Sequence, residues 1–163
     1  MSFVSLQDQI ALDHVECLNL DSVSQVRALF ANDQQQGIKS DIDPQLLISI
    51  PFQNSVRLGG IKVTFGDDFE SRPNGIKLFI NRVSMGFSDA ESLAPIQTVS
   101  YEELKSGETV PLKIALFQNV VSVQIFVEDN NGGERTEIRS LELFGTLGEQ
   151  MNMRDFKKIK EDD

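Results

Sequence analysis

The stretch that decides the fold runs from Phe117 to Asp129 and reads Phe-Gln-Asn-Val-Val-Ser-Val-Gln-Ile-Phe-Val-Glu-Asp. Its residues alternate between two faces with a period of two. One face receives Val121, Val123, Ile125 and Val127, and the other receives Val120, Ser122, Gln124 and Phe126. This alternation predicts a β-strand with one fully buried face, lying near the centre of its sheet.

A turn and a second strand pattern follow this stretch. The sequence Asn130-Asn131-Gly132-Gly133 consists of residues that readily adopt the positive φ of a tight turn, and a strand pattern resumes over residues 136–144. The two strands are therefore predicted to form an antiparallel β-hairpin.

Short strand patterns recur earlier in the chain, between glycine, proline and asparagine signals. They cover residues 45–52, 55–65, 76–81, 96–101 and 110–115. The Gly59-Gly60 pair inside the second of them predicts a bulge, or a bend where a strand changes sheets. Many short strands without βαβ alternation indicate an all-β fold, a jelly-roll β-sandwich of two facing sheets.

Helical signals are sparse. Residues 22–31 combine capping residues with helical spacing of apolar side chains, and residues 88–92 fit one turn with Ser88 as N-cap and Glu91 in a capping box. We therefore expect one or two short helices. The expected organisation is a leader or linker remnant over residues 1–13, a domain over 14–148 and a tail over 149–163.

Composition limits the classes of partner. The chain has 163 residues, 40% of them hydrophobic and 25% charged, which suits a single self-sufficient core. A net charge of −10 repels the phosphates of nucleic acids and of anionic lipids, so neither is expected as a partner. The first residues lack the pattern of a secretory signal, and a lone cysteine, Cys17, agrees with a reducing compartment. We therefore expect an intracellular protein.

Few residues suit catalysis or metal binding. His14 is the only histidine and is expected to be a surface or packing residue, and Cys17 is expected to be a small buried group. No cofactor and no enzymatic activity are expected. Several acidic residues offer oxygen ligands for Ca²⁺ without a complete motif, and we interpret them as solvated loop carboxylates: Asp41, Asp43, Asp67, Asp68 and Glu70. The absence of tryptophan and the single tyrosine, Tyr101, leave little aromatic surface for a sugar.

The tail mixes apolar and basic side chains. Its apolar residues are Met151, Met153, Phe156 and Ile159, and its basic residues are Arg154, Lys157, Lys158 and Lys160. Two interpretations stay open at this stage: the tail folds back onto the sandwich, or it is a docking peptide for a partner.

Several motifs in fixed order resemble the PITH domain family. They are Glu16-Cys17-Leu18-Asn19, the segment from Ser40 to Ile48, Ile76 to Asn81, Val110-Pro111-Leu112, Phe117 to Val120, Ile125 to Asn130 and Ser140 to Gly145. The resemblance extends over roughly residues 14–160. The ending from Asn152 to Lys158 is similar to the branch of the family that is linked to a thioredoxin domain.

This resemblance implies a galactose-binding-domain-like jelly roll that docks on the regulatory particle of the 26S proteasome and catalyses nothing itself. It implies a monomer found in the cytoplasm and the nucleus. In the thioredoxin-linked branch a separate domain carries the Cys-x-x-Cys dithiol, which this chain lacks, so we expect either an excised C-terminal domain or a stand-alone version. A carbohydrate- or Ca²⁺-binding sandwich of the same fold is the alternative.

The residues expected to bind the partner fall into two groups. The tail contributes Arg154, Asp155, Phe156, Lys157 and Lys158. The loop that follows the organising strand contributes Asp129, Asn130, Asn131, Glu134 and Arg135.

Overall fold

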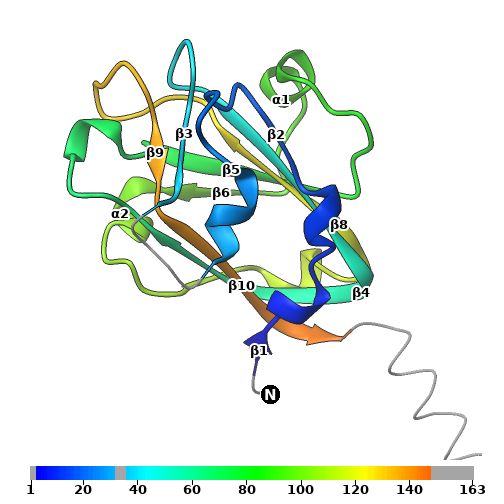
Figure 1. Ribbon diagram of the computed structural model, residues 1–163. Coiled ribbons are helices and arrows are strands. Elements are labelled where there is room, and N and C mark those ends of the chain that lie inside the picture. Colours follow the sequence, from blue (N-terminus) through cyan, green and yellow to red (C-terminus); the bar gives the residue numbers. More distant parts are fainter. Residues whose placement is uncertain (1–2, 32–35, 148–163) are drawn as a thin grey trace, which may run out of the picture.

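The computed structural model describes residues 3–31 and 36–147, and most of its ordered elements are strands (Figure 1). The strands are β1 Val4–Ser5, β2 Glu16–Leu18, β3 Ile38–Lys39, β4 Leu46–Thr64, β5 Gly75–Ile80, β6 Gln97–Ser100, β7 Val110–Pro111, β8 Val120–Val127, β9 Glu137–Ile138 and β10 Ser140–Leu147. The helices are α1 Phe87–Ser92, α2 Tyr101–Leu104 and the 3₁₀ helices η1 Gln7–Gln9, η2 Leu12–His14, η3 Val26–Phe30, η4 Phe69–Ser71 and η5 Ile114–Leu116. The expected all-β class is confirmed.

One curled antiparallel sheet contains most of the strands. Its order is β1-β10-β4-β8-β5-β6, with β2 and β7 also paired to β4, while β3 and β9 pair separately. The two layers expected from the sequence are thus parts of one hydrogen-bonded network, because β4 pairs in both of them.

β4 is the strand on which this sheet is built. Residues 46–51 pair with β8 and residues 56–64 pair with β10. The two strands predicted at 45–52 and 55–65 are therefore the two halves of one continuous strand. The first half pairs with β8 and the second half pairs with β10. The register against β10 shifts between Phe144 and Gly145 and leaves Gly59 unmatched, which confirms the predicted bulge.

β8 lies between β4 and β5, so its predicted central position is confirmed. The predicted hairpin is wrong, since β8 and β10 each pair with β4 and not with each other. After β8 the chain crosses one end of the domain, where it forms hydrogen bonds with other loops. It then returns as β10, which pairs with the second half of β4.

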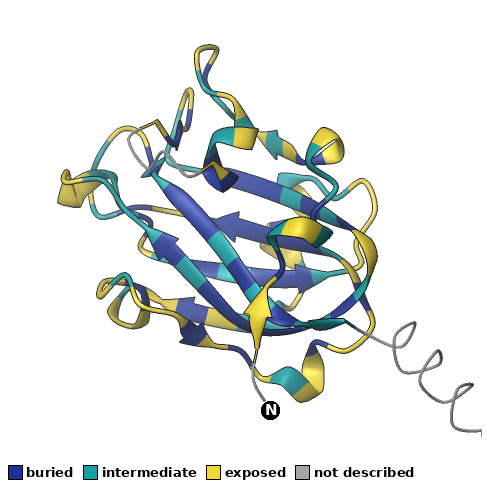
Figure 2. Cartoon of the chain, turned by 60° about the horizontal axis from the view of Figure 1, so that its bottom comes forward, coloured by how far each residue is buried: buried dark blue, intermediate teal, exposed yellow. Residues whose placement is uncertain are grey.

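Burial on β8 also differs from the prediction. Phe126 and Gln124, on the face expected to be less buried, are 0% and 1% exposed, whereas Val121 is 52% exposed. Phe126 belongs to a second, smaller core that contains Leu47, Phe79 and Ala90, because α1 covers the outer side of the sheet there. The main core fills the inside of the curled sheet, and the buried residues follow its strands in Figure 2.

The first described residues form an integral part of the domain. β1 pairs with β10, and Leu6 and Ile10 are buried in the main core. The stretch expected to be a leader over residues 1–13 thus packs with the domain from β1 onward, while the tail over 149–163 lies outside the described residues.

The helices are shorter than the sequence predicts or begin at other residues. The helix expected over residues 22–31 is the 3₁₀ helix η3. The N-cap of α1 is Gly86, whose N–H donates to the Asp89 carboxylate at 3.0 Å, so the predicted cap at Ser88 is wrong. No helix in the described ranges has both the length and the apolar character needed to cross a bilayer.

We expect Gly145→Ala to destabilise the domain by about 3 kcal/mol, because the new methyl group meets backbone and the chain cannot move aside cheaply. A Cβ at Gly145 collides with the carbonyl oxygen of Arg57 in the bulged part of β4. The melting temperature should fall by roughly 6 to 12 °C. Gly86→Ala is the matched control, because a Cβ there approaches only the Asp89 carboxylate, at 4.0 Å. Equal stability of the two variants would contradict the described packing of β10 on β4.

Candidate functional site

Four connecting segments meet at one end of the sandwich, in the upper part of Figure 1. They follow β2, β3, the second half of β4 and β8, and they comprise residues 19–25, 40–45, 66–74 and 129–136. We call this region the loop end. It contains the loop that the sequence analysis selected for partner binding.

Asn19 anchors the segment that follows β3. Its backbone has a φ of 67°, a conformation that asparagine tolerates better than most residues, and this turns its amide toward residues 41–45. Nδ2 donates to Asp43 Oδ1 at 2.8 Å and to the Gln45 carbonyl at 2.8 Å. Oδ1 accepts from the Ile42 N–H at 3.2 Å. One side chain thus holds a whole loop against the end of β2.

The loop after β8 is fixed by the segment that contains η4. The Gly133 N–H donates to the Glu70 carbonyl at 3.0 Å, and the Asn131 N–H donates to the Arg72 carbonyl at 3.2 Å. Asn130 is buried, and its Nδ2 donates to the Arg135 carbonyl at 3.0 Å across its own loop. These bonds set the shape of the loop before any partner is present.

Ser40 and Thr136 join the segment after β3 to the segment after β8. The Thr136 N–H donates to Ser40 Oγ at 2.8 Å, and the Ser40 N–H donates to the Thr136 carbonyl at 2.9 Å. Thr136 Oγ1 donates to the Pro44 carbonyl at 2.6 Å. Both residues are fully buried, so these polar groups are satisfied inside the protein, where an unpaired group is costly.

Asp21 links the first segment to Arg135. Hydrogen bonds donated by Ser24, among them one from its N–H to Oδ1 at 2.8 Å, hold the pKa of Asp21 below its ordinary value, and Arg135 adds to this effect from 3.9 Å. Folding therefore favours the ionised form of Asp21 over the protonated form. This contribution to stability is present at neutral pH and is lost as the pH falls through the lowered pKa.

The surface of the loop end is hollowed and acidic. A hollow of about 350 Å³ lies among Lys39, Glu70 and Glu134, and a second hollow of about 580 Å³ adjoins it and shares Lys39 and Arg135. The exposed carboxylates of the four segments are Asp41, Asp67, Asp68, Glu70, Asp129 and Glu134. Arg135 is the exposed cation of these segments. The field at this end therefore favours a partner with basic or mixed charge.

Three apolar side chains project from the same end. Val23 is 85% exposed, Ile42 is 82% exposed and Phe69 is 53% exposed. Exposed apolar residues gathered on ordered loops are typical of surfaces that another protein covers.

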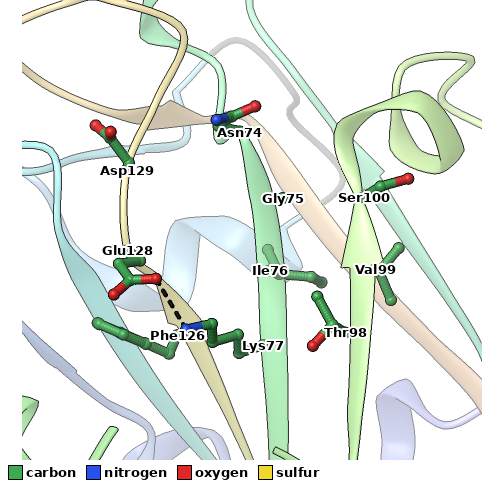
Figure 3. A pocket seen from close by; sticks show the side chains of 10 residues that line it. All are labelled: Asn74, Gly75, Ile76, Lys77, Thr98, Val99, Ser100, Phe126, Glu128 and Asp129. Carbon is green, nitrogen blue, oxygen red and sulfur yellow. Dashed lines mark hydrogen bonds and ion pairs between the residues drawn. The ribbon is translucent and has the colours of Figure 1, made fainter. Parts of the chain in front are cut away.

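A further hollow, of about 240 Å³, opens on the outer face of the sheet between β5, β6 and the end of β8 (Figure 3). Lys77 Nζ lies 2.8 Å from Glu128 Oε1 in this hollow. Gly75 contributes bare backbone to its lining, and Asn74 and Asp129 stand where it meets the loop end. The hollow presents hydroxyl, amide and carboxylate groups beside Phe126, a lining that suits a side chain of a docked protein.

The structure separates the predicted loop residues by role. Asp129, Glu134 and Arg135 are exposed, whereas Asn131 is half-buried. Asn130 is buried and shapes the loop from within. The predicted tail residues, Arg154, Asp155, Phe156, Lys157 and Lys158, lie outside the described residues.

Sequence reasoning missed other residues of the loop end. The anchoring role of Asn19 has a weak signal, because asparagine is enriched where φ is positive. The exposure of Val23, Ile42 and Phe69 leaves no signal in the sequence, since an apolar residue between polar neighbours is as often buried as exposed.

Two of the carboxylates with oxygen ligands for Ca²⁺ accept hydrogen bonds from groups of the loop end. Asp43 Oδ1 accepts from Asn19 and from the Gln45 N–H, and Asp68 Oδ2 accepts from Ser71 Oγ at 2.6 Å. Across residues 3–31 and 36–147, no three His, Cys, Asp or Glu side chains are grouped so that they can hold a metal ion.

Cys17 is poorly suited to nucleophilic chemistry. It packs against the main core from β2, and burial raises the pKa of its thiol to about 12. A thiol with such a pKa is almost entirely protonated at neutral pH. His14 is exposed at the end of η2, and no hydrogen bond in the described part of the chain joins it to Cys17.

Comparisons of sequence identify relatives of this chain. The family model of the PITH domain matches residues 1–162. Thioredoxin-like protein 1 of Schizosaccharomyces pombe is 38% identical over 149 residues, which are 88% of this chain and 51% of that protein. PITH domain-containing protein 1 of Xenopus laevis is 36% identical over 143 residues, which are 84% of this chain and 68% of that protein. The chain thus spans about half the length of the first relative.

Solved structures share the fold at low identity. The family 32 CBM from C. perfringens NanJ, solved in complex with galactose, superposes with a TM-score of 0.66 at 9% identity and covers 88% of this chain and 99% of that one. The expected galactose-binding-domain-like jelly roll is confirmed by this likeness, which concerns the fold alone.

We expect Asn19→Ala to lower the free energy of unfolding by about 2 to 3 kcal/mol, because it removes several hydrogen bonds and leaves their partners unpaired. Amide hydrogen exchange of residues 41–45 should accelerate. Asn119→Ala is the matched control: Asn119 also has a positive φ, of 53°, but donates no side-chain hydrogen bond in the described structure. Asn119→Ala should lower the free energy of unfolding by only about 1 kcal/mol, because alanine tolerates the positive φ less well than asparagine does. Equal losses would show that the Asn19 amide does not anchor the loop.

We expect Cys17 in the folded chain to react with an aromatic disulfide about 30-fold more slowly than in the unfolded chain. A pKa of about 12 lowers the thiolate fraction by roughly three orders of magnitude near neutral pH, and the greater nucleophilicity of a basic thiolate restores about one and a half of them. The rate is followed by the absorbance of the released thiol, with and without guanidinium chloride. Equal rates in the folded and unfolded chains would show that folding does not bury the thiol.

Proposed function

Since this chain belongs to the PITH domain family, we propose that it is a non-catalytic protein-binding module that docks a thioredoxin-like protein onto the regulatory particle of the 26S proteasome. The observation that carries the proposal is the loop end, a preformed surface with exposed apolar side chains and a charged border. Such a surface is built for contact with a large partner.

The rigidity of the loop end supports a docking role. Asn19 and Thr136 each bond across two segments of chain and Asn130 bonds across its own loop, so little conformational entropy remains to be lost when a partner binds. The exposed side chains Val23 and Ile42, and the exposed part of Phe69, whose ring also contacts Tyr101, supply apolar area for such contact.

The chemistry of the domain supports a role without catalysis. The thiol of Cys17 is protonated and the hydrogen-bonding groups of the loop end are engaged in shaping loops. In the proposed function the tail residues from Arg154 to Lys158 add a basic and apolar peptide to the contacts made by Asp129, Glu134 and Arg135.

The link to a thioredoxin-like protein rests on sequence similarity. Thioredoxin-like protein 1 of S. pombe matches this chain over 51% of its own length. The proposal assigns any dithiol chemistry to a part of such a protein other than the domain described here, and it assigns attachment to this domain.

We expect the double variant Asp129→Lys and Glu134→Lys to bind purified 26S proteasome about tenfold more weakly than the unchanged chain, because it removes most of the net negative charge of the exposed loop-end residues. Glu102→Lys with Glu108→Lys is the matched control, since both are exposed acids on or just after α2, and the change in net charge is the same. Surface plasmon resonance with immobilised proteasome measures the affinities, and thermal melting confirms that each variant is folded.

A chain that ends at Gly148 extends the test to the tail. It should melt within about 2 °C of the full chain, because it keeps the described domain, and it should bind the proteasome more weakly. No binding by the unchanged chain would overturn the proteasome as partner. Unchanged binding by both the loop variant and the shortened chain would move the contact to another surface.

Calorimetry distinguishes the alternative function from the proposed one. Titration with Ca²⁺ and with galactose should give no saturable heat under the proposed function. Saturable heat with either ligand would favour the carbohydrate- or Ca²⁺-binding sandwich instead.

A further inference from the structure

The end of the sandwich opposite the loop end carries a second, chemically different surface. It is formed by the bend of β4, by the loop after β5 and by η5 with the start of β8, comprising residues 51–57, 81–87 and 113–122. We call it the far end. None of its residues was selected from the sequence as a site.

Asn81 ties the segments of the far end together. With a φ of 58°, it directs its side chain to the start of β8, where Oδ1 accepts from the Val121 N–H at 2.8 Å and from the Ser122 N–H at 3.2 Å. Its Nδ2 donates to the Asn119 carbonyl at 3.2 Å. Val56 pairs with Val120, which adds the bend of β4 to the same surface.

The far end exposes aliphatic side chains. Val83 is 90% exposed, Val121 is 52% exposed and Leu116 is 46% exposed. The segment from 113 to 122 carries two of them and the loop after β5 carries the third, and Asn81 holds these two segments in contact. Apolar side chains fixed in this way on an ordered surface mark a place that another molecule covers.

The three segments of the far end carry charges of one sign. They contain no aspartate or glutamate, in a chain with 25 such residues, and they contain Arg57, Arg82 and Lys113. Two exposed carboxylates border them: Asp89, which accepts a hydrogen bond from the Gly86 N–H, and Asp8, whose carbonyl accepts from Gln53 Nε2 at 3.4 Å. The three segments are therefore basic although the chain as a whole carries a net charge of −10.

The three cations of the far end are also unpaired. No ion pair involves Arg57, Arg82 or Lys113 in the part of the chain that the structure describes, and the same holds for Lys62 and Arg72. Six other described cations, among them Lys39 and Lys77, each face a carboxylate. Unpaired cations around exposed aliphatic groups complement a partner that brings carboxylates and an apolar side chain.

We propose that the far end is a docking surface for an acidic protein segment with aliphatic or aromatic side chains among its carboxylates. The apolar residues Val83, Leu116 and Val121 contact the apolar side chains of the segment, and Arg57, Arg82 and Lys113 contact its carboxylates. The loop end, which is acidic, repels such a segment. The two ends of the domain thus select partners of opposite charge, and this second surface does not depend on the proteasome being the partner of the first.

A synthetic peptide of alternating glutamate and leucine, with one central phenylalanine and a fluorescent label, tests the proposal. We expect saturable binding to the full chain below about 1 mM by fluorescence anisotropy, weakened at high salt. Amide chemical shifts should change at Arg82, Val83 and Val121 and stay constant at the loop end. The same peptide with lysine for glutamate, or with serine for its apolar residues, should bind at least tenfold more weakly.

Two double variants localise the binding. Arg82→Glu with Val83→Ser should weaken binding of the peptide at least tenfold. Lys39→Glu with Val23→Ser makes the same change at the loop end, where Val23 is similarly exposed, and should leave the affinity within about twofold. Thermal melting of both variants confirms that they are folded.

Each other outcome would overturn the proposal. Absence of binding, or shifts confined to the loop end, would remove the far end as an acidic-segment site. Binding only by the chain shortened after Gly148 would show that the chain's own tail, which begins beside Val56 after Leu147, covers this surface in place of a partner. Proteasome binding measured on the same variants keeps this result separate from the proposed function.

Discussion

The structure depends on a single strand that pairs in both halves of a curled sheet. β4 is 19 residues long and pairs with β8 over its first half and with β10 over its second. A strand of this length stays in two layers only if it bends, and its register against β8 is interrupted between Pro51 and Val56, where this bend lies. The bulge at Gly59, where the Phe3 ring occupies the space of a side chain, then lets β10 approach β4 closely at Gly145. Both ends of the sandwich take their positions from this strand.

Each end of the sandwich is then fixed by an asparagine with positive φ. Asn19 holds the segment after β3 at the loop end, and Asn81 holds the start of β8 at the far end. In both places the unusual backbone conformation turns a short amide side chain back toward a neighbouring segment, where it bonds to backbone groups. Ordered loops that need no further folding are suited to recognition of a partner by surface fit.

Charge is divided between these two ends. The exposed carboxylates of the loop end share its segments with Val23, Ile42 and Phe69, while Arg57, Arg82 and Lys113 share the segments of the far end with its aliphatic groups. The net charge of −10 describes neither surface. A module with two surfaces of opposite charge can hold two different protein segments, which fits a domain that attaches one protein to a larger assembly.

The sequence by itself determined the long strands, the bulge at Gly59, the central place of β8 and the all-β class, because these follow from local periodicity and from the backbone freedom of glycine. The strand predicted over residues 110–115 is wrong beyond Pro111, since β7 ends there and the 3₁₀ helix η5 follows. It also indicated Asp129, Glu134 and Arg135 as loop residues, which the structure leaves exposed. Only the tertiary structure decided that β8 and β10 pair with β4 and not with each other, that α1 buries Phe126, and that Val83 and Val23 remain exposed. Pairing between distant strands and the covering of a side chain depend on segments far away in the chain, whose contacts leave no periodic pattern in the local sequence.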